Sequence, residues 1–488
     1  MKIIISGIVQ GVGFRPFIYR VANKLNLSGY IQNRGDGIVE IYISGEKRNL
    51  DLFLSKIKEE KPILAKYDDI KIVQDTDRKD IKYNDFSIIK SSTKINTIGS
   101  PIQPDVGICN KCINDFSYGQ RRNNYYFISC TDCGPKYSIL ENFPYDRINT
   151  TMNNFPICIK CNNEYNDPNN RLFHYELISC TDCGPKFSLI DRYGDIVTEE
   201  KDPILFCAKL ITEGNIIAAK GIGGFHIITS ATNSNPIIKV RNKKNRKNKP
   251  FAVMSRDLNS TKSFAIINEI EKRILSSSSR PIVLLNKNKK YYLSSAISSL
   301  NTIGVMLPYT GFHISLLNFV QDHVLVMTSG NDTNMPIIKD ENKAIKSLSD
   351  CADYFLIHDR KIFTPCDDSI IKIIENVPIL VRGSRGISPL KLTFKKKSSE
   401  CILALGCEKN VTFSILSNSN CFLSQHIGNL YNIESYNYFK TMIDKSIKFL
   451  NQKEPSIFVC DQHPTLLTTK LAFDLSKKNK ENSLVYQV

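Results

Sequence analysis

The sequence predicts a multidomain α/β protein in which a cysteine-rich module lies between larger units of alternating helices and strands. Two observations support this prediction. The nine residues Ile128–Lys136 (ISCTDCGPK) recur unchanged at Ile178–Lys186, and each copy follows another Cys-x-x-Cys pair. On both sides of this repeat, strand-like and helix-like patterns of apolar residues alternate, in a chain of 488 residues that has room for three or four domains at about 100–200 residues each. We place these domains at residues 1–90, 105–190, 200–390 and 400–488.

The charge of the chain favours an anionic ligand, because the net charge is +17. The most basic run, Arg241–Lys249, contains no aromatic residue that could stack on a nucleobase, so we expect small phosphate ligands and not nucleic acid. No apolar run approaches the roughly 18 residues that a membrane span needs. The N-terminal apolar run is also too short for a signal peptide, so we expect a cytoplasmic protein with reduced thiols and no membrane partner.

The first ninety residues follow the order strand, helix, strand, strand, helix, strand. Lys2–Val9 has a strand pattern, and the helix after it carries apolar residues on one face. A hairpin around Arg34–Gly37, a second helix and strands near Ile70–Val73 and Phe86–Ile89 complete the pattern. This order is that of a ferredoxin-like α+β unit.

A glycine-containing loop, Gln10–Arg15 (QGVGFR), joins the first strand to the first helix. Its two glycines allow backbone N–H groups to converge on an anion, and a guanidinium such as that of Arg15 binds phosphate through two hydrogen bonds. This loop, together with Asn33 on the next strand, resembles acylphosphatase along the whole unit. The resemblance implies that Arg15 and the loop N–H groups hold the phosphate, and that Asn33 positions the attacking water.

The cysteine-rich module predicts two metal sites. Within each repeat, 17 or 18 residues separate the two Cys-x-x-Cys doublets, a spacing at which four thiolates can surround one zinc ion. Four protein ligands leave no open position, so we predict two structural zinc ions, with His174 as a packing residue and not a ligand. A disulfide framework is the alternative, and pairing of doublets across the two repeats is left open by the spacing. The predicted ligands are Cys109, Cys112, Cys130, Cys133, Cys158, Cys161, Cys180 and Cys183.

Residues 201–390 alternate strands with polar and glycine-rich turns, and such turns form phosphate sites at strand ends. This segment resembles the YrdC-like α/β domain of threonylcarbamoyl-adenylate synthases, which activate a carbamate-type carboxylate with ATP. The resemblance places the nucleotide, as its Mg complex, at Lys244, Arg246, Ser329 and Asn331. It also brings three further cations to the phosphate and carbamate region, namely Lys220, Lys249 and Arg382.

The last ninety residues predict a fourth domain. After a basic linker at Lys391–Glu400 we expect three short strands, a helix, a strand, another helix and a final strand. The three short strands are expected at Cys401–Gly406, Val411–Leu416 and Cys421–Ser424. The region resembles the first part of the actin-like, sugar-kinase-like domain of carbamoyl-transferring proteins. The His-rich metal and nucleotide site that follows in that family is missing from the sequence, so we expect a partial domain and a chain that is the N-terminal portion of a longer protein.

Four modules in this order resemble one family, the carbamoyltransferases that mature NiFe-hydrogenases. The resemblance implies a relay in which the first module hydrolyses carbamoyl phosphate to carbamate, and the third uses ATP to form carbamoyl-adenylate. The fourth would pass the carbamoyl group to the C-terminal cysteine of a partner maturation protein, for synthesis of the cyanide ligand of the hydrogenase iron. Because the fourth module is expected to be partial, we expect transfer to fail in this chain alone or to need a second polypeptide.

Two other functions fit parts of the sequence. A carbamoyltransferase acting on a small hydroxylated metabolite would use similar third and fourth modules, but the phosphatase-like and zinc modules argue against it. A nucleic-acid-binding zinc protein would account for the charge and the two four-cysteine sites, and strongly salt-dependent binding would distinguish it. On the enzyme interpretation, the zinc module acts as a rigid spacer between the phosphatase-like unit and the adenylating unit.

Overall fold

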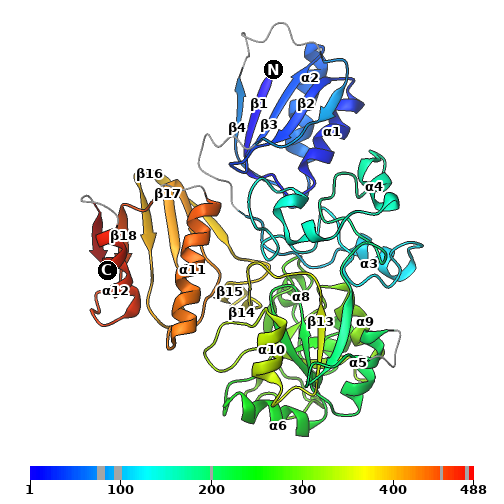
Figure 1. The fold of residues 1–488 in the computed structure, drawn as a ribbon, viewed down its shortest axis with the longest axis vertical. Coiled ribbons are helices and arrows are strands. Elements are labelled where there is room, and N and C mark those ends of the chain that lie inside the picture. Colours follow the sequence, from blue (N-terminus) through cyan, green and yellow to red (C-terminus); the bar gives the residue numbers. More distant parts are fainter. Residues whose placement is uncertain (74–82, 93–101, 198–201, 451–453, 479–482) are drawn as a thin grey trace.

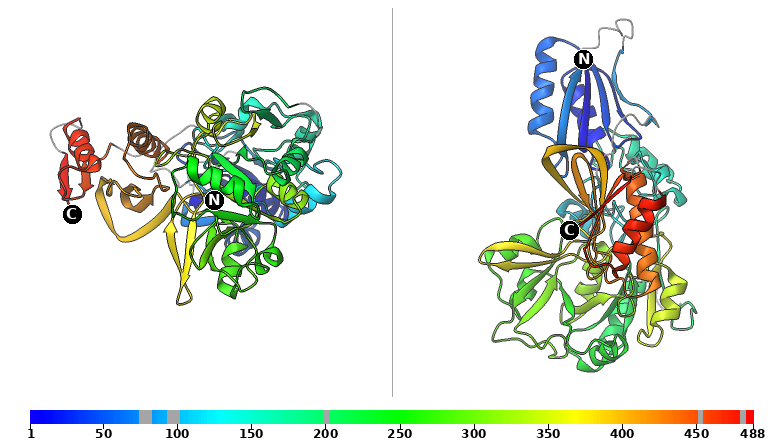
Figure 2. Two further views of the ribbon diagram at one scale, coloured as in Figure 1. Left: turned by 90° about the horizontal axis from the view of Figure 1, so that it is seen from below. Right: turned by 90° about the vertical axis from the view of Figure 1, so that its left-hand side faces the viewer.

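The computed structural model describes residues 1–73, 83–92, 102–197, 202–450, 454–478 and 483–488. Three sheets surround a central cysteine-rich module (Figure 1). The N-terminal sheet lies at one end of the long axis, the largest sheet lies at the other, and the C-terminal sheet stands to one side. Two further views show helices α11 (Ile433–Phe449) and α12 (Leu467–Lys478) on that same side (Figure 2). Among the described helices, none is long and apolar enough to cross a membrane.

The N-terminal unit has the predicted ferredoxin-like order of elements. Its strands run β4-β1-β3-β2-β5, with β5 parallel to β2 and the other neighbouring pairs antiparallel. The inward faces of the strands and of the two helices form one buried core that includes Ile5, Ile41 and Phe53. The elements are β1 (Lys2–Ile8), α1 (Phe14–Lys24), β2 (Ser28–Asn33), β3 (Val39–Ser44), α2 (Lys47–Glu59), β4 (Lys66–Val73) and β5 (Phe86–Ile88).

The cysteine-rich module consists mostly of loops, and its two repeats make equivalent contacts with each other. The Tyr125 hydroxyl of the first repeat donates to Ser179 Oγ (3.0 Å), and the Tyr175 hydroxyl of the second donates to Ser129 Oγ (2.7 Å). The two copies therefore pack as a pseudo-symmetric pair. Each copy starts with a short helix directly after its first cysteine, α3 (Asn110–Tyr118) and α4 (Ile159–Asn166).

The largest unit is a ten-stranded mixed sheet with helices on both faces. One core packs α5 and α9 against the sheet through residues such as Ile204 and Leu316, and a second core on the other side includes Ile237, Leu275 and Ala344. The strand order is β15-β14-β10-β11-β9-β12-β8-β7-β13-β6. The strands are β6 (Phe187–Asp191), β7 (Ile217–Lys220), β8 (Phe225–Ser230), β9 (Ala252–Ser255), β10 (Ile282–Asn286), β11 (Thr302–Met306), β12 (Val324–Ser329), β13 (Tyr354–His358), β14 (Ile370–Ile374) and β15 (Val377–Arg382). The helices are α5 (Pro203–Thr212), α6 (Ser234–Lys243), α7 (Leu258–Lys262), α8 (Glu269–Leu275), α9 (Gly311–Phe319) and α10 (Glu341–Leu348).

The edge of this sheet crosses the predicted boundary of the cysteine-rich module. Strand β6 follows the second cysteine repeat directly, yet it pairs with β13 along five residue positions, from Phe187↔His358 to Asp191↔Tyr354. The end of the cysteine-rich module is therefore anchored in the ten-stranded sheet.

The C-terminal unit corrects one prediction. We expected three short strands after a basic linker, but two long antiparallel strands, β16 (Leu390–Ala404) and β17 (Ser414–Leu423), occupy this region. The linker is part of β16, and the second and third expected strands correspond to the single strand β17. The sheet order is β17-β16-β18-β19, with β18 (Ile457–Cys460) and β19 (Leu484–Gln487) parallel to their neighbours.

The cysteine-rich module touches all three sheet-bearing units. Towards the N-terminal unit, the Tyr145 N–H donates to Gln10 Oε1 (2.9 Å). Towards the ten-stranded unit, the Gly107 N–H donates to the Ser278 carbonyl oxygen (2.8 Å). Towards the C-terminal unit, Tyr137 lies in a shared apolar core and its hydroxyl donates to Gln425 Oε1 (2.8 Å). The module is thus placed to fix the positions of the three units relative to one another.

Candidate functional site

The loop between β1 and α1 surrounds a small pocket. Gly11 and Gly13 have φ angles of 71° and 73°, in the left-handed region that favours glycine. Gly13 is also the N-cap of α1, so the positive end of the helix dipole adds to the loop N–H groups. The pocket has a volume of about 320 Å³, and the predicted residues Arg15 and Asn33 both line it. The geometry is that of a site for a small anion.

Two carboxylates of the cysteine-rich module reach Arg15 in this pocket. Arg15 Nη2 lies 2.6 Å from Glu176 Oε1 and 2.9 Å from Asp146 Oδ1. Burial raises the pKa of Glu176, although Arg15 opposes that shift. Burial acts to lower the pKa of Arg15, but Glu176 and Asp146 raise it overall. A phosphate group entering the pocket therefore competes with two carboxylates for the guanidinium.

Asn33 and His174 complete the polar lining of this pocket. Asn33 is 1% exposed, and its Oδ1 has no hydrogen-bond partner among the described residues, which leaves a buried acceptor ready for a ligand or a water. The His174 ring packs against Tyr165, with Nδ1 at 3.2 Å from the Tyr165 hydroxyl. Burial lowers the pKa of His174 to about 4, so this imidazole is neutral near pH 7.

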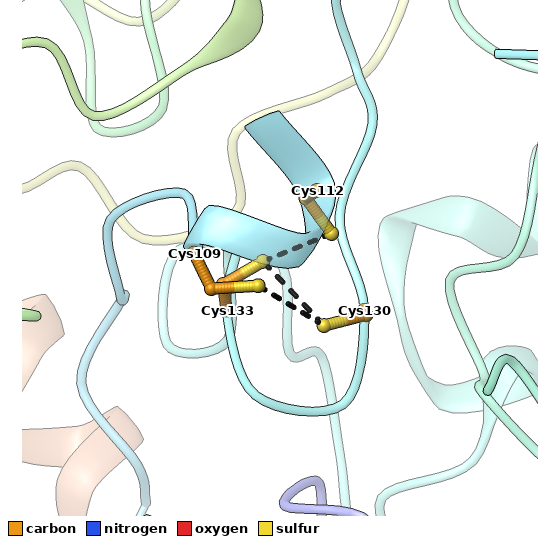
Figure 3. A group of neighbouring side chains, drawn as sticks. All are labelled: Cys109, Cys112, Cys130 and Cys133. Carbon is orange, nitrogen blue, oxygen red and sulfur yellow. Dashed lines mark hydrogen bonds between the residues drawn. The ribbon is translucent and has the colours of Figure 1, made fainter. Parts of the chain in front are cut away.

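The eight paired cysteines form two four-sulfur clusters, and each cluster stays within one repeat. Figure 3 shows the first, in which the two cysteines of α3 and its N-cap face the two cysteines of the following loop. Neighbouring sulfurs are 3.6–3.8 Å apart in both clusters. A tetrahedron with Zn–S bonds of about 2.3 Å has an edge of about 3.8 Å, so each cluster fits one zinc ion. The clusters are Cys109, Cys112, Cys130 and Cys133, and Cys158, Cys161, Cys180 and Cys183.

An arginine from each repeat reaches the sulfur cluster of the other repeat. Arg121 Nη2 of the first repeat lies 2.9 Å from Cys161 Sγ in the second cluster. Arg171 Nη1 of the second repeat lies 3.4 Å from Cys112 Sγ in the first cluster. Since the two arginines are 50 positions apart, like the second doublets of the repeats, they occupy equivalent places. Each cluster therefore receives a compensating positive charge from its neighbour.

The second candidate site is a pocket of about 2440 Å³ between the ten-stranded sheet and the C-terminal unit. Burial lowers the pKa of Lys244 to about 8, and its ammonium donates to the carbonyl oxygens of Ser329 (2.8 Å) and Asn331 (2.6 Å). Arg246 lies over the Phe251 ring at 4.9 Å, and burial lowers its pKa to about 10. Six of the seven residues predicted for the nucleotide and carbamate line this pocket: Lys244, Arg246, Lys249, Ser329, Asn331 and Arg382.

Lys220 does not join the other predicted residues. Its ammonium pairs with Glu341 and donates to the carbonyl oxygens of His358 and Arg360 (2.9 Å each), and it lines a different cavity of about 420 Å³. The strand that carries Lys220 ends at the glycine turn, and Lys220 lines the cavity that borders the cysteine-rich module and not the large pocket. Lys220 is therefore placed to hold β7, β13 and α10 together.

A buried network that the sequence did not reveal lies at the wall of the large pocket. Asp368 Oδ1 accepts from Arg385 Nε (2.6 Å), and Asp368 Oδ2 lies 3.0 Å from His226 Nε2. The Arg385 guanidinium also lies 3.6 Å from the centre of the Tyr309 ring. Burial acts to raise the pKa of Asp368, but Arg385 and His226 hold it well below its usual range. The network fixes the turn that carries Asp367 and Asp368 into the pocket.

The sequence also missed the residues that the cysteine-rich module supplies to the first pocket. Glu176 and Asp146 are far from Arg15 in the chain, and no spacing rule connects them. The arginines at the sulfur clusters did carry a signal, because Arg121 and Arg171 have the same spacing to the second doublet of their own copy. Eight residues separate each arginine from the next cysteine of its repeat. Aligning the two copies with each other would have identified this pair.

Known protein families match the chain in the order of these units. The matching family models are Acylphosphatase over residues 1–88, HypF finger over 108–140 and 157–190, Telomere recombination over 209–384, and HypF Kae1-like domain over 397–486. A protein of Methanocaldococcus jannaschii named "Probable carbamoyltransferase HypF" is 40% identical over 481 residues, which is 98% of this chain and 62% of that protein. The chain is a member of the HypF family. The fold class predicted from the sequence is thereby confirmed.

Solved structures and smaller relatives agree with this assignment. A crystal structure of full-length HypF in a phosphate- and nucleotide-bound form superimposes with a TM-score of 0.92 at 37% identity, covering 100% of this chain and 62% of that one. An acylphosphatase of Archaeoglobus fulgidus is 51% identical over 63 residues, or 13% of this chain and 71% of that protein. The chain thus spans about three fifths of the length of the HypF proteins that it matches.

Proposed function

We propose that this HypF-family chain hydrolyses carbamoyl phosphate in the pocket of the β1–α1 loop. The observation that carries the proposal is the convergence, in one buried pocket, of a left-handed glycine loop, a helix N-terminus, the Arg15 guanidinium and the unpaired Asn33 amide oxygen. Preorganised donors of this kind stabilise the charge that develops during phosphoryl transfer. Arg15 and the loop N–H groups hold the phosphate, and the Asn33 amide orients the attacking water. The products are carbamate and inorganic phosphate.

The large pocket then activates the carbamate with ATP and Mg, forming carbamoyl-adenylate and pyrophosphate. Its support is the basic lining from Lys244 to Lys249 opposite Ser329 and Asn331, together with the nucleotide-bound HypF structure that the chain resembles. Lys244, Arg246 and Arg382 neutralise the phosphates, while the side chains of Ser329 and Asn331 orient them. The seventh predicted residue, Lys220, has a structural place in this proposal and no nucleotide contact.

The two sulfur clusters hold structural zinc ions in this proposal. When bound, each ion cross-links a helix N-terminus to the following loop, and four thiolates leave it no position for substrate. We further propose, on the names of the relatives, that the carbamoyl group passes to the C-terminal cysteine thiolate of a maturation partner. Incubation with ATP, carbamoyl phosphate and that acceptor, followed by mass spectrometry for a thiocarbamate, tests this last step separately.

The substitution Arg15→Ala tests the first step. Loss of a charged donor from a preorganised anion site should lower the rate of phosphate release from carbamoyl phosphate by about 10²–10³-fold. Two zinc ions per chain should be retained, because Arg15 does not contact either cluster. The matched control is Arg48→Ala, which removes an exposed arginine of α2 in the same unit and should leave the rate unchanged. Phosphate release at the wild-type rate by Arg15→Ala would overturn the proposed function.

A further inference from the structure

The side chain of Lys136 is the most unusual buried cation in the described parts of the chain. It is 0% exposed, and its Nζ has no hydrogen-bond partner among the described residues. Its surroundings offer two ring faces, those of Tyr175 and Tyr145, with centres 5.4 and 5.8 Å away. Cation–π contacts offset part of the cost of burying an ammonium group, but they leave its three N–H donors unused. A buried ammonium with unused donors is suited to bind an anion.

The duplicated sequence supplies an internal comparison. Lys136 and Lys186 end the two identical nine-residue copies, yet Lys186 is exposed to solvent. The backbone N–H of each lysine is held in the same way, by a carboxylate oxygen of Asp105 (2.7 Å) or of Asp359 (3.0 Å). Local sequence and backbone anchoring are therefore alike, and only the surroundings of the two ammonium groups differ. Lys136 is therefore buried because of its position between the units. Zinc binding by the neighbouring cysteine doublet does not require this burial, since Lys186 is exposed beside the equivalent doublet.

That place lies beside the first pocket. Gln10 and Tyr145 line both the pocket of Arg15 and a second cavity of about 280 Å³, and Lys136 lines this second cavity. Two residues further on, the Ser138 carbonyl oxygen accepts from the N–H groups of Phe363 (2.8 Å) and Thr364 (3.1 Å). From Thr364 the chain continues through Asp367 and Asp368 to Ile370 at the start of β14, and these last three residues line the large pocket. The segment carrying Lys136 therefore bridges the N-terminal unit and the ten-stranded unit.

We propose that the Lys136 ammonium binds a small carboxylate-type anion, which, if the function proposed above holds, is the carbamate produced at Arg15. The Lys136 ammonium and the Tyr145 ring line the second cavity, and the Tyr175 ring lies 5.4 Å from the ammonium, so an anion bound here would shed most of its water. A carbamate held there is kept from bulk solvent after the phosphate has been cleaved from it. Lys136 acts as a positioning residue between the two reactions and takes no part in bond breaking.

The test uses the full zinc-loaded chain with Lys136→Met, which keeps an unbranched side chain and removes the charge. Lys186→Met is the matched control, because it makes the same change in the same sequence at the exposed site. The first readout is binding of [1-¹³C]acetate, a stable carboxylate of the same size as carbamate, followed by NMR line broadening. The second readout is pyrophosphate formed per phosphate released when carbamoyl phosphate and ATP are supplied together.

Wild type and Lys186→Met should bind acetate saturably, and Lys136→Met should bind it about 10- to 100-fold more weakly, the range expected for one charge-assisted hydrogen bond. The ratio of pyrophosphate to phosphate should fall at least about tenfold in Lys136→Met alone. Absence of saturable acetate binding to the wild type, or equal binding by Lys136→Met, overturns the inference. If Lys136→Met retains fewer than two zinc ions, Lys136→Gln takes its place. Absence of phosphate release by the wild type overturns the proposed function instead, whatever acetate does.

Discussion

The reciprocal arginines predict that each zinc site depends on the repeat that does not contain it. Arg171→Met should weaken metal binding at the first cluster, whose Cys112 sulfur accepts from Arg171, and Arg121→Met should weaken the second cluster. Four thiolates around a dication leave a net charge of about −2, so an adjacent guanidinium stabilises the loaded site more than the empty one. Methionine preserves much of the side-chain volume and removes the charge.

The geometry sets the size of the effect. Arg121 Nη2 lies 2.9, 3.4 and 3.5 Å from the sulfurs of Cys161, Cys158 and Cys180, whereas a single contact of 3.4 Å is formed by Arg171. Hydrogen bonds to charged groups contribute about 1.5–3 kcal/mol, and the side chains of both arginines are roughly a quarter exposed, which favours the lower value. Zinc affinity should therefore fall about tenfold in Arg171→Met and more in Arg121→Met.

Cadmium substitution makes the two sites separately visible. Each four-thiolate cluster gives its own ¹¹³Cd resonance, and Cys112→Ser identifies the resonance of the first cluster. Titration with a chelator should then remove the first resonance early in Arg171→Met and the second early in Arg121→Met. Lys111→Met and Lys160→Met are matched controls, because these exposed lysines lie inside the first doublets and the structure gives them no contact with sulfur.

The result that would refute this reasoning is specific. If Arg171→Met weakens the cluster of its own repeat, or weakens both clusters equally, the cross-repeat contact does not determine affinity. Equal effects of the arginine and lysine substitutions would show that general surface charge, and not the N–H···S contact, sets the metal affinity.

Three further predictions follow from the buried titratable groups. Glu176→Gln should bind inorganic phosphate about tenfold more tightly near pH 8, measured by calorimetry, because the substitution removes the carboxylate that competes for Arg15. In the wild type, phosphate affinity should rise as the pH falls, since the raised pKa of Glu176 brings protonation of this carboxylate closer to neutral pH. ATP affinity should be full below the pKa of Lys244 and fall as the pH rises through about 8, because the ammonium then loses its charge, and Lys244→Met should remove this dependence. Asp368→Asn should lower the free energy of unfolding by about 3–5 kcal/mol in urea denaturation, because Arg385 is left buried without its partner. In the wild type the pKa of Asp368 is depressed, so the stability from this ion pair is present above about pH 4 and is lost as the pH falls below that value.

Much of the fold could be predicted because its signals are local. Alternating apolar residues and the two glycines of the β1–α1 loop identify the first unit, and the doublet spacing identifies the metal clusters. The C-terminal hairpin was predicted wrongly for a physical reason. The outer half of β16, from Lys391 to Glu400, is mostly exposed, so its side chains show no alternation between core and solvent. Pairing with β17, as in Leu392↔Cys421, makes it a strand, and a single sequence does not display that pairing.

The residues of the candidate sites likewise divide into those with a local sequence signal and those without one. Arg15 in the first turn of α1 and Asn33 at the end of β2 are close in sequence, and the structure brings them to one pocket. The resemblance to YrdC-like domains grouped Lys220 with the phosphate and carbamate residues, but Lys220 lines a different cavity, where its ammonium contacts Glu341 and two carbonyl oxygens. Glu176 reaches Arg15 across 161 positions of sequence. Contacts of this range depend on how complete units dock, which residue spacing does not encode.

The two cysteine repeats show how identical sequence takes on different tasks. Between the copies, contacts are reciprocal, as with the arginines and the tyrosine–serine pairs. Towards the other units, the second doublet of the first copy packs on the β1–α1 loop, where a Cβ at Gly13 would lie 2.8 Å from the Thr131 side chain. The first copy also buries Lys136. The second copy leaves Lys186 in solvent and continues into β6 of the ten-stranded sheet. Because the contacts between the two copies hold them together, displacement of either sulfur cluster should shift both the β1–α1 loop and the ten-stranded sheet. The module is therefore more than a spacer, because its pseudo-symmetric interior links two different outer surfaces, each of which borders a different candidate site.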